Sequence, residues 1–530
     1  MVLREIMATQ KIKRPSLRYP MIPVYEILKE TAQRLPKKLA IIDPRGDRKL
    51  TFADLDRESD ILAGFFFSWG IRKGDRISFF MENGWEYFVG FYATMKVGAV
   101  VSPMNFAFRE QKVKHQVNDA ESKLLLVQHN LLPIIERSLP ELPTLEKIVV
   151  TRGPKPEKEK FFTLADLLKN SSSLSAFPPL SIHPQEDLAA LPYTSGTAGL
   201  SKGVMISHFN LAANTMQAIH SIEAREEDIL ISFLPFNHIY GFTYFLCGAI
   251  YLGATQVIMG RFEAEECLRL VEQYRVSLML SVPPALLALF YLPTADHYDT
   301  SSLRYIWVGA APLPSTVLQG IRQKFNVPLS RHYGLTEASP STHANPPDRP
   351  KEGSVGIAVS DCEDRIMDWD TGKKEMPCGE PGELAVRGPN VFRGYWKHPE
   401  DTKLALRDGW LYTGDIARMD EEGYVYILDR KKDMIKYQGY KIGPTELEAI
   451  LMEHPAVQDC AVAGIPDEQS GEIPKAFVVL RQGLIVKPEE LKEFVAARVP
   501  SYKQIREVAL IAAVPKNPSG KILRRVLKKW

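Results

Sequence analysis

The chain alternates short buried strands with helices, and this order restricts its fold more than any other feature. Residues 76–81 (RISFFM) are typical of a buried strand, residues 85–99 of a helix and residues 100–105 (VVSPMN) of the next strand. Thr51 and Asp54 stand at capping-box spacing, so we expect a helix to begin there. Strand–helix–strand order predicts parallel sheets with helices on both faces, which is an α/β fold.

The last hundred residues follow a different pattern. After Asp429 the order is helix (residues 444–454), strand, strand, helix (residues 488–498) and strand. A unit of this length can bury a modest core of its own. Because the chain has 530 residues, more than one compact domain is expected in any case. The sequence therefore predicts a large α/β domain followed by a small α+β domain.

Charge and cysteine usage exclude several classes of protein. The formal net charge is +2 and no long basic run occurs, which argues against a nucleic-acid partner. The five cysteines are an odd number and none has CxxC spacing, so we expect reduced thiols with no zinc site and no disulfides. Residues 1–16 lack the apolar core of a signal peptide. We expect a cytoplasmic protein.

One uncharged segment is long enough to suggest a membrane span. Residues 229–260 contain no Asp, Glu, Lys or Arg, and a bilayer needs about 20 apolar residues. However, Pro235 and Asn237 interrupt the first half of the segment, and Gly248 and Gly253 reduce the number of apolar side chains in the second half. No positively charged loop flanks one side only, as an oriented span requires. We predict a buried helix followed by a core strand, with no transmembrane segment.

Residues 193–204 (YTSGTAGLSKGV) form a loop that is suited to an anion. Its glycines free backbone amides that can form a nest for phosphate oxygens. The loop adds side-chain donors at Thr194, Ser195 and Thr197, and a positive charge at Lys202. It fails the phosphate-loop pattern because Ser201 precedes Lys202, and it lacks the flanking glycines of a serine-hydrolase elbow. On this stretch alone, a surface loop without a ligand stays an alternative.

Four further motifs follow the loop in a fixed order: YGLTE (333–337), YTGD (412–415), LDRKKDMIKYQGYKIGPTELE (428–448) and PKNPSGKILRR (515–525). With the loop, they resemble the adenylate-forming superfamily of acyl-CoA synthetases, 4-coumarate–CoA ligases, beetle luciferases and peptide-synthetase adenylation domains. The resemblance covers the chain from about Pro23 to its end. The loop departs from the family pattern at Ala198, usually threonine, and at Ser201, usually proline.

The resemblance implies a domain organisation and a two-step reaction. It implies a large N-terminal domain at residues 1–428 with a β-barrel-like part, a hinge at 429–432 and a small mobile domain at 433–530. In the first step a carboxylic acid attacks ATP, which gives acyl-AMP and pyrophosphate. In the second step CoA gives acyl-CoA and AMP. ATP and CoA are then co-substrates and Mg²⁺ is the cofactor.

The resemblance also assigns residues to the first step. The implied ATP-binding residues are Thr194, Ser195, Gly196, Thr197, Lys202, Gly309, Ala310, Ala311, Pro312, Tyr333, Asp415 and Arg430. Among the catalytic residues, Glu337 matches the Mg²⁺ ligand, Thr336 the hydroxyl on the α-phosphate, and Lys521 the lysine that bridges carboxylate and nucleotide. A lysine suits that place because its compact ammonium can sit between two oxygen anions. Without the resemblance, Glu337 could equally be an ordinary solvated glutamate, and Lys521 could be one of several cations in a basic C-terminal segment.

Adenine is expected between backbone at Gly309–Pro312 and the Tyr333 ring. Arg331 and His332 stand where glutamine or asparagine and glycine are commoner, so no contact to the adenine edge is carried over.

A second set of residues serves the thioester step in the family. Lys436, Gly439 and Tyr440 match the face of the small domain used there, and a glycine lets pantetheine pass closely. One rigid arrangement cannot present both this face and Lys521 to one site. The resemblance therefore implies that the small domain rotates, with Lys432 at the hinge. A plain solvated linker is the other interpretation of this charged segment.

The acceptor and the acid are narrowed by what the sequence lacks. In the similar adenylation domains of peptide synthetases, an aspartate in the stretch that matches residues 236–238 pairs with the ammonium of the amino acid, and no carboxylate stands there in this chain. Fatty acyl-AMP ligases that load carrier proteins have an insertion in the large domain, and no surplus segment of this kind occurs between residues 353 and 395. CoA is therefore the expected acceptor. Loading of a carrier protein and a catalytically silent nucleotide-binding regulator remain the alternatives, and a homodimer is left open.

The implied acid pocket comprises His238, Tyr240, Tyr244, Gly309, Gly334, Ser339 and Pro340. In acetyl-CoA synthetases a tryptophan matches Gly334 and walls off all but the smallest acids. Glycine there is expected to leave apolar space, and each unfilled methylene forfeits about 0.8 kcal/mol of burial. A medium-chain, aromatic or alicyclic acid is therefore expected rather than acetate.

Overall fold

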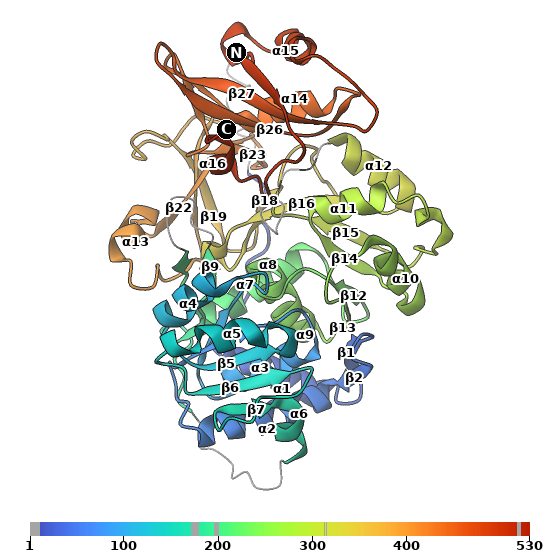
Figure 1. Ribbon diagram of the computed structural model, residues 1–530, viewed down its shortest axis with the longest axis vertical. Coiled ribbons are helices and arrows are strands. Elements are labelled where there is room, and N and C mark those ends of the chain that lie inside the picture. Colours follow the sequence, from blue (N-terminus) through green and yellow to red (C-terminus); the bar gives the residue numbers. More distant parts are fainter. Residues whose placement is uncertain (1–10, 171–179, 195–200, 312, 314, 517–520) are drawn as a thin grey trace, which may run out of the picture.

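The computed structural model describes residues 11–170, 180–194, 201–311, 313, 315–516 and 521–530. Two large sheets lie side by side below a smaller domain, which Figure 1 shows in orange and red. The helices of the large domain are α1 (Val24–Arg34), α2 (Phe52–Ser68), α3 (Trp85–Lys96), α4 (Glu110–Asp119), α5 (Leu132–Ser138), α6 (Leu164–Lys169), α7 (His208–Ser221), α8 (Ile239–Gly241), α9 (Ile250–Leu252), α10 (Ala264–Tyr274), α11 (Pro283–Phe290), α12 (Ser315–Phe325) and α13 (Pro399–Ala405).

The first sheet has the strand order β11-β8-β4-β3-β5-β6-β7. Its strands are β3 (Arg76–Phe80), β4 (Val100–Pro103), β5 (Ser122–Gln128), β6 (Lys147–Thr151), β7 (Phe161–Thr163), β8 (Leu188–Ala190) and β11 (Ile206–Ser207). All neighbours are parallel except β11 and β8. The expected strand, helix and strand over residues 76–105 are present as β3, α3 and β4.

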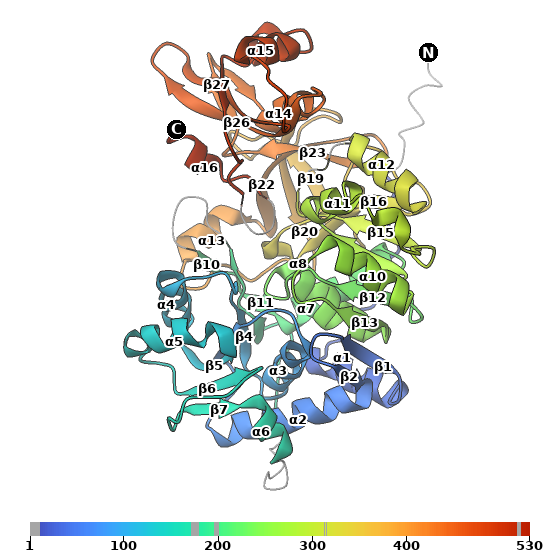
Figure 2. The ribbon, with the colours of Figure 1, turned by 45° about the vertical axis from the view of Figure 1, so that its right-hand side comes forward.

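The second sheet has the order β18-β17-β16-β15-β14-β12-β13-β1-β2. Its strands are β1 (Leu39–Asp43), β2 (Arg48–Thr51), β12 (Ile229–Ser232), β13 (Thr255–Ile258), β14 (Leu278–Ser281), β15 (Tyr305–Val308), β16 (Leu329–Gly334), β17 (Ser341–Ala344) and β18 (Ile357–Ala358). The run from β1 to β16 is parallel. Helices α10, α11 and α12 cover its outer face (Figure 2).

Helix α3 contacts β4 of the first sheet and β1 of the second, and its only charged residues, Glu86 and Lys96 near its two ends, form ion pairs. All of its residues from Glu86 to Lys96 are buried, as expected for a helix that is hydrophobic all round. Helix α2 begins with the capping box that the sequence predicts: the Asp54 amide donates to Thr51 Oγ1 and the Thr51 amide to Asp54 Oδ2, both at 3.1 Å. Gly70, two residues past the helix, has φ = 86°.

The uncharged segment 229–260 lies inside the large domain. It runs through β12, α8, a π-helical segment η4 (Phe242–Ala249), α9 and β13, so the buried helix and core strand are confirmed; the helix is continuous from Ile239 to Leu252 and is π-helical in its middle. Every residue of η4 is buried. Within the described part of the chain, no helix is long and apolar enough to cross a membrane.

A third, antiparallel sheet joins the two large sheets to the small domain. It contains β19 (Glu363–Met367), β20 (Gly382–Arg387), β21 (Leu406–Arg407), β22 (Trp410–Met419) and β23 (Val425–Arg430). Two-residue strands β9 (Tyr193–Thr194) and β10 (Lys202–Gly203) form a separate antiparallel pair.

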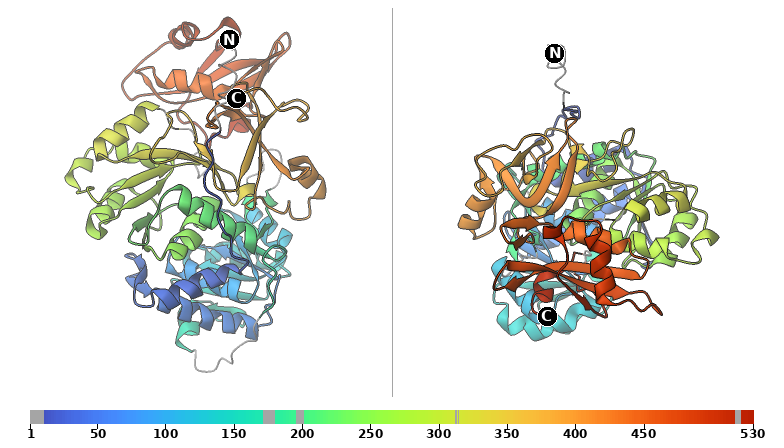
Figure 3. Two further views of the ribbon diagram at one scale, coloured as in Figure 1. Left: turned by 180° about the vertical axis from the view of Figure 1, so that it is seen from behind. Right: turned by 90° about the horizontal axis from the view of Figure 1, so that it is seen from above.

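The small domain is built on a sheet of order β25-β24-β27-β26, with β28 beside β27. Its elements are β24 (Ile435–Tyr437), β25 (Tyr440–Ile442), α14 (Pro444–Met452), β26 (Val457–Asp467), β27 (Gly471–Leu480), α15 (Pro488–Ala496), β28 (Glu507–Leu510) and α16 (Arg524–Leu527). Its principal core contains only residues of this domain. The fold class is therefore confirmed, and the small domain covers one end of the large one (Figure 3).

The capping box gives a test of the local structure. We expect Thr51→Ala to lower the free energy of unfolding by about 1 kcal/mol, because the substitution leaves an amide of the first turn without its acceptor. Denaturant unfolding followed by circular dichroism measures the change. Thr300→Ala, in a turn outside any helix, is the matched control. Equal stabilities of the two variants would contradict the capping role.

Candidate active site

A buried carboxylate lies where β22 and β23 pair side by side. Asp415 is opposite Arg430 in the register, and Arg430 Nε donates to Asp415 Oδ1 at 2.7 Å. The Tyr333 hydroxyl donates to the other carboxylate oxygen. Only 3% of the Asp415 side chain is exposed, so these two donors replace its solvent. The carboxylate raises the pKa of Arg430, which keeps the guanidinium charged.

Lys521 reaches this cluster from the end of the chain. The pKa of Lys521 is lowered to about 8, chiefly by burial and next by the nearby positive charge of Arg430, whereas Asp415 and Glu337 act in the opposite direction. These interactions mean that an ammonium group of the small domain lies among charges of the large domain. The structure therefore brings Lys521, Asp415, Arg430 and Glu337 into one site.

His238 lies beside the same lysine. It precedes α8, and its Nδ1 accepts from the Tyr240 amide at 3.3 Å. Burial lowers its pKa to about 4, and Lys521 contributes to the shift. The imidazole is therefore neutral near pH 7 and can accept or donate a hydrogen bond without adding charge.

Glu337 is held by contacts that sequence reasoning did not predict. It lies in the short helix η6 (Thr336–Ala338), which also contains the predicted Thr336. The Tyr395 hydroxyl donates to Glu337 Oε1 at 2.8 Å. Lys202 lies 5.8 Å from the Tyr395 ring and pairs with Asp401 at 2.6 Å. Neither Tyr395 nor Asp401 stands in a motif that points to such a role.

The arrangement suits a magnesium ion that is shared with a phosphate ligand. No cluster of three or more acidic, histidine or cysteine residues among the described residues can hold a metal on its own. Mg²⁺ commonly takes one or two carboxylates, with phosphate oxygens and water completing its octahedron. Glu337 offers such a carboxylate close to Lys202, so the residues present fit the ion.

The glycine-rich loop is described only at its two ends. Thr194 pairs with Lys202 across β9 and β10. The predicted contacts Ser195, Gly196 and Thr197 lie outside the described residues. The Tyr193 hydroxyl donates to Asp119 at 2.5 Å, and His115 Nε2 lies 2.9 Å from the Ser201 carbonyl oxygen. The base of the loop is therefore tied to α4.

The predicted adenine segment follows β15. Gly309 is buried, Ala310 has φ = 72°, and Ala311 comes next, whereas Pro312 lies outside the described residues. Tyr333 is predicted to contact the opposite face of the adenine ring, and its hydroxyl donates a hydrogen bond to Asp415. Arg331 Nη2 donates to the Leu313 carbonyl oxygen, so this guanidinium is tied to the segment.

Two of the residues predicted for the acid pocket, Tyr240 and Tyr244, pack together in the structure. Tyr240 and Tyr244 are buried with ring centroids 5.2 Å apart, and both rings contact His332. The Ser339 carbonyl oxygen accepts from Thr243 at 2.7 Å, which fixes the Ser339–Pro340 turn against η4.

The structure gives a different explanation for the glycine at position 334 from the one that the sequence suggested. A Cβ atom at this position would overlap the backbone carbonyl of Pro340, because β16 and β17 approach closely there. The glycine therefore does not face the open apolar space expected of it. Since even an alanine would displace backbone, Gly334→Trp is expected to disrupt this turn and cannot test pocket size.

The predicted thioester-step residues lie on the small domain's hairpin of β24 and β25. Lys436, Gly439 and Tyr440 are exposed, and Tyr440 stacks on Tyr502 with centroids 4.4 Å apart. Next to them, Lys441 pairs with Asp370 of the large domain at 2.5 Å. The structure thus brings Lys521 to the charged cluster and holds this hairpin against a different part of the large domain. The predicted hinge residue Lys432 follows β23 and is exposed.

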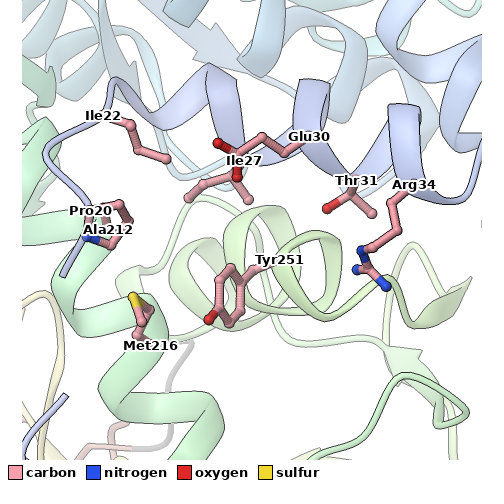
Figure 4. Close-up of a pocket in the computed structure, with 9 residues that line it drawn as sticks. All are labelled: Pro20, Ile22, Ile27, Glu30, Thr31, Arg34, Ala212, Met216 and Tyr251. Carbon is pink, nitrogen blue, oxygen red and sulfur yellow. The ribbon is translucent and has the colours of Figure 1, made fainter. Parts of the chain in front are cut away.

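A separate cavity of about 250 Å³ lies between α1, α7 and α9 (Figure 4). Side chains of Ile27, Met216 and Tyr251 point into it, with Glu30 and Arg34 at its rim. None of the predicted site residues lines this cavity. It is a feature apart from the charged cluster.

Comparison with known proteins gives two family matches that together cover most of the chain. The model described as "AMP-binding enzyme" matches residues 28–396, and "AMP-binding enzyme C-terminal domain" matches residues 446–521. A relative named 4-coumarate–CoA ligase-like 9 from Oryza sativa subsp. japonica is 36% identical, covering 96% of this chain and 92% of its own. A long-chain-fatty-acid–CoA ligase from Bacillus subtilis is 36% identical, with 94% and 93% coverage.

Solved structures agree over the same length. The anthranilate–CoA ligase AuaEII, in complex with anthranoyl-AMP, has a TM-score of 0.88 at 26% identity and covers 96% of this chain and 97% of its own. ATP-bound MatB from Rhodopseudomonas palustris has a TM-score of 0.86 at 29% identity, with 95% and 98% coverage.

The lowered pKa of Lys521 predicts an alkaline limit. If the charged ammonium is needed, kcat/KM for the ATP-dependent step falls as pH rises through about 8, because Lys521 then loses its proton. The pH dependence of kcat/KM reports pKa values of the free enzyme, which is the state that the structure describes. Lys521→Arg keeps its charge and is expected to move this limb to higher pH, although at lower activity. Pyrophosphate release between pH 6.5 and 10 measures both profiles. Lys516→Arg, whose lysine pairs with Asp459, is the control. Identical limbs for the wild type and Lys521→Arg would contradict the assignment.

Proposed function

The chain belongs to the AMP-binding enzyme family and is an acid–thiol ligase, an acyl-CoA synthetase, and we propose that it activates a medium-chain, aromatic or alicyclic carboxylic acid. The acid reacts with ATP to give acyl-AMP and pyrophosphate, and CoA then displaces AMP to give acyl-CoA. The proposal rests on one observation: an ammonium of the small domain, Lys521, lies among Asp415, Glu337 and His238 of the large domain.

The first step brings two anions together, so its barrier is lowered mainly by positive charge and alignment. Asp415 would accept the ribose hydroxyls in place of its contacts to Tyr333 and Arg430. Lys521 would then lie between the acid's carboxylate and the α-phosphate and would neutralise both. His238, neutral at this pH, would orient the carboxylate by a hydrogen bond without competing for charge.

The pyrophosphate end of ATP would lie toward Lys202 and Glu337. Bound Mg²⁺ would neutralise phosphate charge there, with Glu337 as its protein ligand and Thr336 beside the α-phosphate. Lys202 would exchange Asp401 for phosphate oxygens. Because Asp401 is about a third exposed, water can solvate it once the pair is broken.

The second step requires the face that carries Lys436, Gly439 and Tyr440. The structure supports an exchange of faces, because Lys521 occupies the charged cluster while this hairpin is exposed and contacts Asp370 through Lys441. We propose that the domain boundary lies at residues 429–432 and that rotation there presents Gly439 to the thiol's path. Lys432 would absorb much of the dihedral change.

The aromatic side chains of the predicted acid pocket support the proposed size of the acid. Tyr240 and Tyr244 present ring surface that a flat or alicyclic acyl group would cover, and acetate would cover little of it. The similarity to ligases named for 4-coumarate and long-chain fatty acids agrees with an acid larger than acetate.

Separated half-reactions test the proposal. We expect Lys521→Ala to lose acyl-adenylate formation by at least a hundredfold and yet to form thioester from supplied acyl-AMP at nearly the wild-type rate, because the lysine is needed only while the anions approach. Pyrophosphate release and thioester formation are measured with cinnamate, hexanoate, cyclohexanecarboxylate and acetate. Lys528→Ala, whose lysine pairs with Glu472, is the control.

The same measurements give the opposing outcomes. Equal loss of both half-reactions in Lys521→Ala would remove its assigned role. A wild-type preference for acetate would refute the size argument, and a holo carrier protein that outcompetes CoA would replace CoA as the acceptor.

Lys432→Pro tests the hinge. Proline fixes φ near −65°, so we expect thioester formation to slow about tenfold or more while acyl-adenylate formation stays within a few-fold of wild type. Rapid-mixing assays of each half-reaction measure this split. Lys431→Ala, which removes the adjacent pair with Glu383 but leaves the backbone free, is the control. Unchanged thioester formation in Lys432→Pro would rule out rotation at this residue.

A further inference from the structure

His332 occupies the meeting point of the predicted nucleotide segment and the aromatic side chains of the predicted acid pocket. It lies on β16, and a Cβ atom at Gly309 would overlap its Nε2. The Tyr240 ring meets the imidazole edge-on at 4.6 Å, and the Tyr244 ring lies nearly parallel to it at 5.7 Å. Trp307 stands behind at 6.4 Å. The imidazole therefore fills the space over Gly309 and forms part of the same wall as the two tyrosines.

This histidine is buried with one of its two ring nitrogens unpaired. It is 8% exposed, and its Nδ1 has no hydrogen-bond partner among the described residues. Burial lowers its pKa to about 3, so the ring is neutral at physiological pH. A neutral imidazole always carries one donor and one acceptor. Leaving such a group unpaired in an apolar cage is costly, and a simple packing role would be served better by phenylalanine.

The neighbouring side chains do not supply the missing partner. The Tyr244 hydroxyl is 2.9 Å from Ser341 Oγ, and the Tyr240 hydroxyl is itself buried with no hydrogen-bond partner among the described residues. Gly309 adjoins Nε2 and has no side chain, so it offers no side-chain partner to Nδ1. An acyl group bound against the two tyrosines would supply a polar partner for the ring.

We propose that His332 is a specificity-determining residue that favours a flat, uncharged acyl group with a hydrogen-bonding substituent over an unsubstituted acyl group of equal size. The inference rests on the proposed function, because it assumes that the acid lies against Tyr240 and Tyr244. A hydroxyl or carbonyl oxygen on the acid would pair with the imidazole, whereas an unsubstituted acid would leave the ring unpaired. A site that hydrogen-bonds its substrate discriminates against analogues that lack the group.

Matched acids and two variants test the proposal. Cinnamate is compared with its 2-, 3- and 4-hydroxy derivatives, both by pyrophosphate release and by calorimetric binding in the presence of AMP. At least one hydroxy isomer is expected to be preferred about tenfold by the wild type. His332→Phe keeps a flat ring without polar atoms and is expected to remove the preference while cinnamate itself is retained within about threefold. His332→Asn keeps a donor and an acceptor and is expected to retain part of the preference.

The outcomes separate this inference from the proposed function. No preference for any hydroxy isomer in the wild type, or the same preference in folded His332→Phe, would overturn the role of His332 while acid activation stands. If His332→Phe does not fold, judged by thermal melting, equal treatment of cinnamate and its hydroxy forms by His332→Asn overturns it. Failure of every acid to release pyrophosphate would instead refute the proposed function, and the binding preference would still report on His332.

Discussion

The buried carboxylate of Asp415 is the constraint around which the site is arranged. A charge with so little water must take its partners from protein, and Asp415 takes Arg430 from the next strand and Tyr333 from the second sheet. Lys521, from the opposite end of the chain, lies within the same field. One group thereby links the antiparallel sheet, the parallel sheet and the small domain. It also leaves a set of polar contacts that a polyhydroxyl ligand can replace one for one.

The sequence was most informative where structure depends on local chemistry. The capping box at Thr51, the strands on either side of α3 and the helix and strand order after Asp429 all follow from residues close together in the chain. The ordered motifs were equally informative about the site, because Tyr333, Glu337, Asp415 and Lys521 each stand in one of them. The hinge, the domain limits and the roles of individual residues remain predictions.

Features that depend on distant contacts were beyond the sequence. Gly334 was interpreted as an opening of the pocket, but its neighbour is the Pro340 backbone across a strand pair, which no local pattern reveals. Tyr395 reaches Glu337 from a separate loop and carries no motif. The π-helical geometry of η4, which packs against α7, is likewise not indicated by the local sequence. In the sequence, His332 is only a departure from a family pattern. The structure adds that it is buried with an unpaired ring nitrogen.

The pair between Lys441 and Asp370 bears on the proposed rotation of the small domain. The Asp370 side chain is 68% exposed and the Lys441 side chain 30% exposed, and the lysine also lies 4.5 Å from the Trp369 ring. Exposed ion pairs contribute about 0–1 kcal/mol, so this contact biases an orientation without trapping it. A buried apolar contact in its place would oppose the proposed rotation of the small domain more strongly. Because salt screens exposed charges, higher ionic strength is expected to weaken this pair and so to favour release of the hairpin in that rotation.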